Sequence, residues 1–131
     1  MIALDTNVLL RHLAEDDPAQ VARVRDLLAH LEQTAHRAFI NDVVPCELAW
    51  VLRSRYSLKR DAIAAKLDKV LGTWTFVFAD PEKFSAAIAD YREGQGDFAD
   101  YLIGRRNGAA GCEHTVTFDK DLAAHPAFVV L

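Results

Sequence analysis

Acidic side chains that could bind a metal ion or exchange protons occur in four separate segments of the chain. The first is Asp5, which follows a short apolar run and precedes Thr6 and Asn7. This pattern is typical of a buried strand that ends in polar residues and passes into a helix. Because ligands bind at the carboxyl ends of strands in an open parallel sheet, Asp5 is a candidate site residue. The alternative is that Asp5 or Thr6 only caps the following helix.

Glu47 is the second acidic candidate, because it falls within the apolar stripe of an expected helix. The apolar residues that share its face are Val43, Val44, Leu48, Val51 and Leu52. An unpaired charge buried in such a stripe would be costly. Three interpretations stay open: Glu47 reaches water at the edge of the stripe, joins a buried ion pair, or contributes a carboxylate to a metal site.

Asp97 and Asp100 form the third acidic segment, after the flexible sequence Gly94-Gln95-Gly96. Residues three apart share a face of a helix, so Asp97 can cap a helix while Asp100 lies in its first turn. Such capping still leaves a second carboxylate oxygen to face a crevice. Gly104 lies one turn beyond Asp100 and would let this helix approach a neighbouring backbone closely.

The segments that must position these acids alternate between strand and helix patterns. Short apolar or β-branched runs predict five strands, at the N-terminus and at 38–40, 74–78, 115–118 and 126–131. Apolar residues at helical spacing predict helices between them, among them 18–34 and 81–92. This alternation favours one α/β domain over residues 1–131, a three-layer arrangement with a mainly parallel central sheet and helices on both faces.

These elements would bring four acids to one rim of the sheet. Asp5 follows the first strand and Asp119 the fourth, while Glu47 and Asp100 fall in the first turns of helices expected to begin nearby. Like charges held close repel strongly, and a divalent cation is the usual compensation. Oxygen ligands without thiolate or imidazole suit Mg²⁺ or Mn²⁺. The pattern therefore indicates attack by metal-activated water on a phosphodiester.

The composition limits the class of protein. A net charge of −4 argues against general electrostatic binding of nucleic acid, but it does not exclude a nucleic-acid enzyme. No run approaches the roughly 18 apolar residues of a membrane span, and no signal peptide is expected. The two cysteines form no zinc motif, so a reducing cytoplasmic setting is expected. A basic cluster, either a solvated face or a track for an anionic substrate, is formed by Arg53, Arg55, Lys59 and Arg60.

Taken together, the acidic segments resemble those of the PIN-domain family, and within it the VapC-type ribonuclease toxins of bacterial toxin–antitoxin pairs. The matching blocks are Leu4-Asp5-Thr6-Asn7-Val8-Leu9-Leu10-Arg11, Glu47-Leu48-Ala49-Trp50-Val51-Leu52, Asp97-Phe98-Ala99-Asp100-Tyr101-Leu102-Ile103 and Thr117-Phe118-Asp119. The resemblance implies a Mg²⁺- or Mn²⁺-dependent endoribonuclease that cleaves RNA. It also implies a VapB-like cognate antitoxin whose C-terminal segment occludes the acidic cleft, homodimers, and a five-stranded parallel sheet in the order 3-2-1-4-5.

The resemblance carries over to particular residues of this chain. The family's acidic quartet, which would bind the metal and act in catalysis, is matched by Asp5, Glu47, Asp100 and Asp119. Asp97 belongs to the same motif block and is either a further metal ligand or a helix cap. The residues that look like supports orienting these carboxylates are Thr6, Asn7 and Thr117.

Two other functions compete with the metal-dependent nuclease. One is a phosphoryl-transfer enzyme that uses Asp5 as its nucleophile. Phosphatases of the haloacid dehalogenase type need a second Asp two residues further on, where this chain has Asn7. The other is a binding module with a PIN-like fold and a catalytically inert cleft. Metal binding would separate the nuclease from the inert module.

Overall fold

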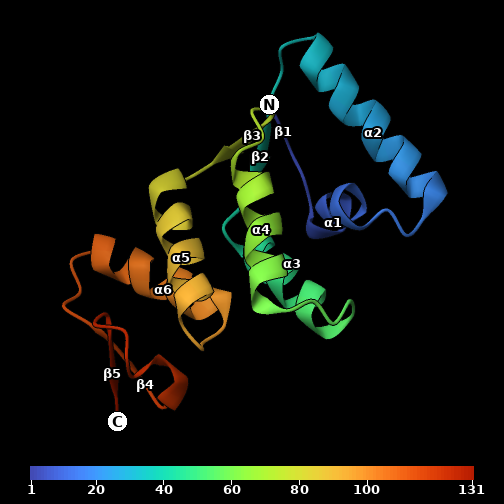
Figure 1. Ribbon diagram of the computed structural model, residues 1–131. Coiled ribbons are helices and arrows are strands. Elements are labelled where there is room, and N and C mark those ends of the chain that lie inside the picture. Colours follow the sequence, from blue (N-terminus) through green and yellow to red (C-terminus); the bar gives the residue numbers. More distant parts are fainter.

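Short parallel strands joined by helices make up the computed structural model, which describes residues 1–131 (Figure 1). The elements in chain order are β1 (Ile2–Ala3), α1 (Thr6–Ala14), α2 (Pro18–Gln33), β2 (Ala38–Ile40), α3 (Val43–Ser54), α4 (Arg60–Leu71), β3 (Phe76–Phe78), α5 (Pro81–Glu93), α6 (Phe98–Ala109), β4 (Thr115–Thr117), the 3-10 helix η1 (Lys120–Leu122) and β5 (Phe128–Val130). This alternation confirms the α/β class. None of the helices combines the length and apolar character that a membrane span requires.

The five strands are divided between two sheets. In the first, β1 pairs with β2 and β2 with β3, all parallel, and in the second β4 pairs in parallel with β5. Figure 1 shows β4 and β5 at the C-terminal end of the molecule, well away from β1–β3. The expected pairing of the first and fourth strands is therefore not seen. Since β1 contains only two residues, it offers few main-chain hydrogen bonds to a further strand.

Helix starts follow the local signals in the sequence. Asp17 and Asp80 accept hydrogen bonds from backbone amides three residues on, at 3.1 and 3.0 Å, and a proline occupies the first helical position in each case. The predicted helices 18–34 and 81–92 are accordingly confirmed to within one residue. The predicted strand 74–78 is shorter, because the amide of Phe76 bonds to Thr73 in a turn and the strand begins only there.

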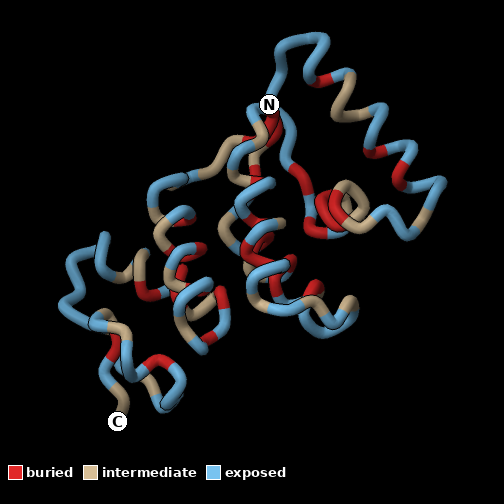
Figure 2. Tube along the Cα trace, viewed as in Figure 1, coloured by how far each residue is buried: buried red, intermediate tan, exposed pale blue.

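The buried side chains form one core that runs through the helices, as the red segments of Figure 2 show. The apolar faces of α4, α5 and α6 pack against one another at its centre. Aromatic rings fill this region, with the Phe98 ring centroid 5.7 Å from that of Phe84 and 6.2 Å from that of Tyr91. The face of α5 is the one that helical spacing in the predicted helix 81–92 indicates, with Phe84, Ala87, Ile88 and Tyr91 buried.

The two-stranded sheet is attached to α5 and α6 by a charged cluster. Arg105 donates two hydrogen bonds of 2.7 Å to Asp90, and His125 Nε2 lies 3.1 Å from the same carboxylate. Nearby, a side chain at Gly104 would put its Cβ 2.7 Å from Phe128. The close approach predicted at Gly104 is thus present, although the neighbour is an aromatic ring and not a backbone.

Candidate active site

Asp5 both caps α1 and presents a carboxylate to solvent. Its Oδ1 accepts a hydrogen bond of 2.8 Å from the Thr6 amide, while the side chain stays exposed. Leu4, just before it, is buried and its amide bonds to Phe39 at the end of the β1–β2 pairing. The two interpretations of Asp5 are therefore compatible, because capping uses only one of its two oxygens.

Thr6 connects this strand end to Glu47 on α3. The Thr6 side chain is only 7% exposed, and its hydroxyl donates a hydrogen bond of 3.2 Å to Glu47 Oε1. Glu47 itself is exposed, so it lies at the edge of the apolar stripe and not inside it. Of the three interpretations from the sequence, a buried ion pair is excluded. The Glu47 carboxylate therefore lies against Thr6, the first residue of α1.

Asp100 lies half-buried in the first turn of α6, close to other acids. Burial raises the pKa of its carboxyl, and the charges of Asp97 and Asp119 raise that pKa further, while the backbone amide of Asp97 partly opposes them. The end of β4 and the start of α6 therefore bring their acids within electrostatic range of one another. The predicted gathering of Asp100 and Asp119 in one metal site stays a prediction.

Thr117 positions Asp119 at the end of β4. The Asp119 amide donates a hydrogen bond of 3.0 Å to the Thr117 hydroxyl, and Asp119 Oδ1 accepts one of 2.9 Å from the Asp121 amide. Thr117 thus supports Asp119 through its backbone. Asn7, in contrast, is exposed and makes no hydrogen bond to any carboxylate, so the support predicted for it is not seen.

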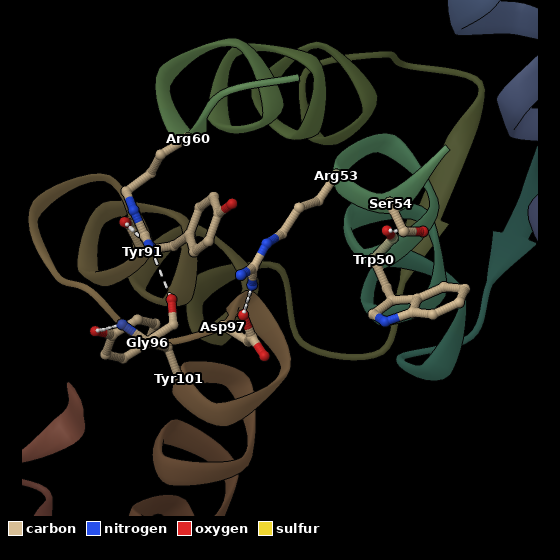
Figure 3. Close-up of polar contacts among 8 residues, drawn as sticks. All are labelled: Trp50, Arg53, Ser54, Arg60, Tyr91, Gly96, Asp97 and Tyr101. Carbon is tan, nitrogen blue, oxygen red and sulfur yellow. Dashed lines mark hydrogen bonds and ion pairs between the residues drawn. The ribbon is translucent and has the colours of Figure 1, made fainter. Parts of the chain in front are cut away.

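Asp97 forms an ion pair with Arg53 of α3, as Figure 3 shows. It stands at the N-cap position of α6 but its side chain accepts no capping hydrogen bond. Sequence reasoning missed this partner, because Arg53 lies 44 positions earlier within a basic cluster that favoured a solvated face. The sequence predicts that Asp97 is either a metal ligand or a helix cap. The structure gives it a third role, as the counter-ion of Arg53.

The loop that leads into α6 is fixed by Arg60 and Tyr101 (Figure 3). Arg60 donates hydrogen bonds of 2.9 and 2.7 Å to the carbonyls of Tyr91 and Gly96, and its guanidinium lies 4.4 Å from the centroid of the Tyr91 ring. From the other side, the Gly96 amide donates to the Tyr101 hydroxyl at 3.0 Å. These contacts hold the start of α6, and with it Asp100, against α4 and α5.

Helix α3 borders two acidic regions: one is formed by Asp5 and Glu47, and the other lies at the start of α6, with Asp97 and Asp100. Glu47 faces Thr6 on one side, and the neighbouring Cys46 faces α6 on the other. Burial, followed by the charges of Asp42 and Asp100, raises the pKa of the Cys46 thiol to about 11. A thiol with this pKa is protonated near neutral pH, so Cys46 is not an activated nucleophile.

The candidate ligand atoms suit a hard cation, but they are not gathered around one point. All candidate ligands are carboxylates, which suit Mg²⁺ or Mn²⁺. No three Asp, Glu, His or Cys side chains, however, lie close enough together to hold a metal ion. The reason lies in the sheets: Asp119 follows β4, which pairs with β5, while Asp5 follows β1 of the other sheet. The two strand ends expected on one rim therefore belong to different sheets.

Comparison with known proteins identifies one family. The family model described as PIN domain matches residues 2–127 of the chain. No curated protein shows significant similarity to the chain, and no solved structure does either. The family match covers all four acidic segments.

Proposed function

The chain belongs to the PIN domain family, and we propose that it is a metal-dependent endoribonuclease. PIN domains are generally nucleases, so hydrolysis of a phosphodiester is the activity that the fold favours. The observation that carries the proposal is the arrangement of acids around α3: Thr6 donates to Glu47 of this helix, while Asp97, at the start of α6 that carries Asp100, pairs with Arg53, also of α3.

The chain's own residues suit this chemistry. Asp5, Asp100 and Asp119, with Asp97 as a further candidate, would hold Mg²⁺ or Mn²⁺, which when bound activates water for attack on phosphorus. Glu47 uses one carboxylate oxygen to accept from Thr6, so its second oxygen stays available to take a proton from the attacking water. Thr6 and Thr117 hold Glu47 and Asp119 in place.

The proposal extends to the biological setting. We assign the chain to the VapC-type toxins, acting in the cytoplasm on RNA as a homodimer and inhibited by a cognate antitoxin whose C-terminal segment covers the acidic groups. The block resemblance over four segments supports this assignment. It also supports a five-stranded sheet in the order 3-2-1-4-5 for the active form, which would bring Asp119 to the rim that carries Asp5.

The test is cleavage of total RNA by the purified protein with Mg²⁺ or Mn²⁺, against EDTA. Asp5→Ala and Asp100→Ala should abolish cleavage while the circular dichroism spectrum is kept. Asp26→Ala, which removes an exposed acid on α2, is the matched control and should cleave normally. Undiminished cleavage by Asp5→Ala or Asp100→Ala would refute the proposal.

The separation of the acidic side chains favours one alternative to the nuclease, a binding module without catalytic activity. Since no three candidate ligands are gathered, such a module would bind no metal ion. Calorimetric titration with Mn²⁺ separates the two functions. Heat of binding that disappears in Asp100→Ala favours the nuclease, whereas the absence of any heat favours the inert module.

A further inference from the structure

Trp50 is a large apolar side chain that the fold leaves uncovered. It lies on α3 one turn after Glu47, and 64% of it is exposed, although Leu48 and Leu52 of the same helix are fully buried. A single exposed apolar residue is ordinary on a protein surface, so the exposure of Trp50 is informative only together with its neighbours. An indole ring offers a flat apolar face on which another ring can stack. Trp50 is thus available to contact another molecule.

The surroundings of Trp50 place it beside the acidic groups. It lines a small hollow between α3 and the start of α6, together with Cys46, Arg53, Asp97 and Ala99. In Figure 3 its indole ring lies clear of the other residues drawn, while Arg53 reaches across to Asp97. Trp50 and Asp97 border the same hollow, so a molecule bound at Asp97 would lie next to this ring.

Positive charge follows Trp50 in the sequence, in the last turn of α3 and in the segment that joins α3 to α4. Arg53 comes one turn later, and beyond it Arg55 and Lys59 are exposed and form no ion pair within the chain. The pair between Arg53 and Asp97 is itself exposed on both sides, and such pairs contribute little to stability. Arg53 can therefore exchange Asp97 for another anion at little cost.

We propose that Trp50 stacks against a base of single-stranded RNA while Arg53, Arg55 and Lys59 contact its phosphates. This rests on the proposed nuclease function and identifies a binding surface for its substrate. Along α3 the Glu47 carboxylate, the Trp50 ring and the Arg53 guanidinium follow at intervals of about one turn. Stacking on an aromatic ring next to basic residues is the usual way in which proteins hold single strands without regard to sequence.

RNA fits this surface better than a second copy of the chain. Lys and Glu are depleted in protein–protein interfaces, and this surface carries Glu47 and Lys59, although Trp and Arg are common there. A two-fold contact centred on Trp50 would also bring two sets of Arg53, Arg55 and Lys59 toward each other. Phosphates, in contrast, would neutralise these cations.

The direct test uses the fluorescence of Trp50. The chain has two tryptophans, so Trp74→Phe leaves Trp50 as the only one. A pool of short single-stranded RNA with random sequence, added in EDTA at low salt to prevent cleavage, should quench its emission. The matched variant Trp50→Phe leaves the exposed Trp74, and its emission should not change. Unchanged emission of Trp50 at saturating RNA would overturn the proposal.

Affinity gives the second measurement, from the anisotropy of labelled RNA from the same pool. Trp50→Ala should weaken binding by about 10-fold, and Trp50→Phe by much less, since a ring remains. Trp74→Ala, at an equally exposed site elsewhere, should bind like the unaltered chain. Circular dichroism of Trp50→Ala should match that of the unaltered chain, because the ring is outside the core.

The outcomes separate this inference from the nuclease proposal. If the unaltered chain neither binds nor cleaves RNA, both fail. If it binds and cleaves RNA and Trp50→Ala binds equally tightly, only the stacking role fails. Light scattering that shows a dimer converted to a monomer by Trp50→Ala, with RNA affinity unchanged, would assign Trp50 to contact between copies and also overturn the inference.

Discussion

The hydroxyl of Thr6 donates a hydrogen bond to Glu47 Oε1 at 3.2 Å and so joins the first turn of α1 to α3. Thr6 is buried and Glu47 is exposed, so a buried hydroxyl orients a carboxylate that faces solvent. This hydrogen bond adds a polar contact to the packing of α1 against α3. Its removal should therefore affect activity more than stability.

Thr6→Val replaces the hydroxyl by a methyl group of similar shape and leaves Glu47 without its partner. We expect single-turnover RNA cleavage to fall by about 10- to 100-fold, and the free energy of unfolding to fall by only about 1 kcal/mol. Thr6→Ser keeps a hydroxyl and serves as the matched control. Cleavage by the valine variant at the rate of the unaltered chain would show that Glu47 needs no such support.

Arg53→Ala should strengthen metal binding. Arg53 neutralises Asp97 beside Asp100, so its removal frees a carboxylate and takes away a competing cation. Because the pair is exposed, we expect the affinity for Mn²⁺ to rise by only about 2- to 5-fold. Calorimetric titration measures this change, with Arg55→Ala as the control for loss of a nearby positive charge. Weaker Mn²⁺ binding by Arg53→Ala would contradict this role.

The attachment of β4 and β5 should depend on pH through Asp90. Burial raises the pKa of this carboxyl, but hydrogen bonds from Arg105 and His125 outweigh it and lower the pKa below its ordinary value. A carboxyl whose pKa is lower in the folded state contributes stability at neutral pH. That contribution is lost as the pH falls below the ordinary carboxyl range, about 4.

Asp90→Asn should therefore reduce the free energy of unfolding by about 1–3 kcal/mol at neutral pH and by less in acid. Urea denaturation across this pH range measures both effects. Asp68→Asn is the comparison, because Asp68 forms a more exposed pair with Arg92 and should matter less. Equal losses for Asp90→Asn at neutral and acid pH would show that the ion pairs do not supply the stability.

Local features of the chain were accessible from the sequence, whereas contacts between distant segments were not. Helix boundaries followed from prolines and capping aspartates, because these signals act within one turn. Strand pairing depends on which short strands meet in space, and the division between β1–β3 and β4–β5 has no local signal. In the same way, no spacing rule connects Arg53 with Asp97, and the burial of Thr6 became visible only once α3 was in place.

Asp100→Asn should stabilise the protein in the absence of metal ions. Burial and the nearby charges of Asp97 and Asp119 raise the pKa of this carboxyl, so its ionised form is disfavoured in the folded state. An amide of the same shape avoids that penalty. Sites arranged for chemistry often sacrifice stability in this way.

We expect a small gain in the free energy of unfolding in EDTA at neutral pH, reduced by solvent screening because the carboxyl is only partly buried, with a higher melting temperature. Asp26→Asn on the exposed face of α2 is the control for loss of one negative charge and should change little. Excess Mn²⁺ should reverse the order, because the unaltered chain would then gain stability from binding and the variant would gain less. A variant that is less stable than the unaltered chain in EDTA would show that the Asp100 carboxylate is held mainly by favourable contacts, and not by repulsion from its neighbours.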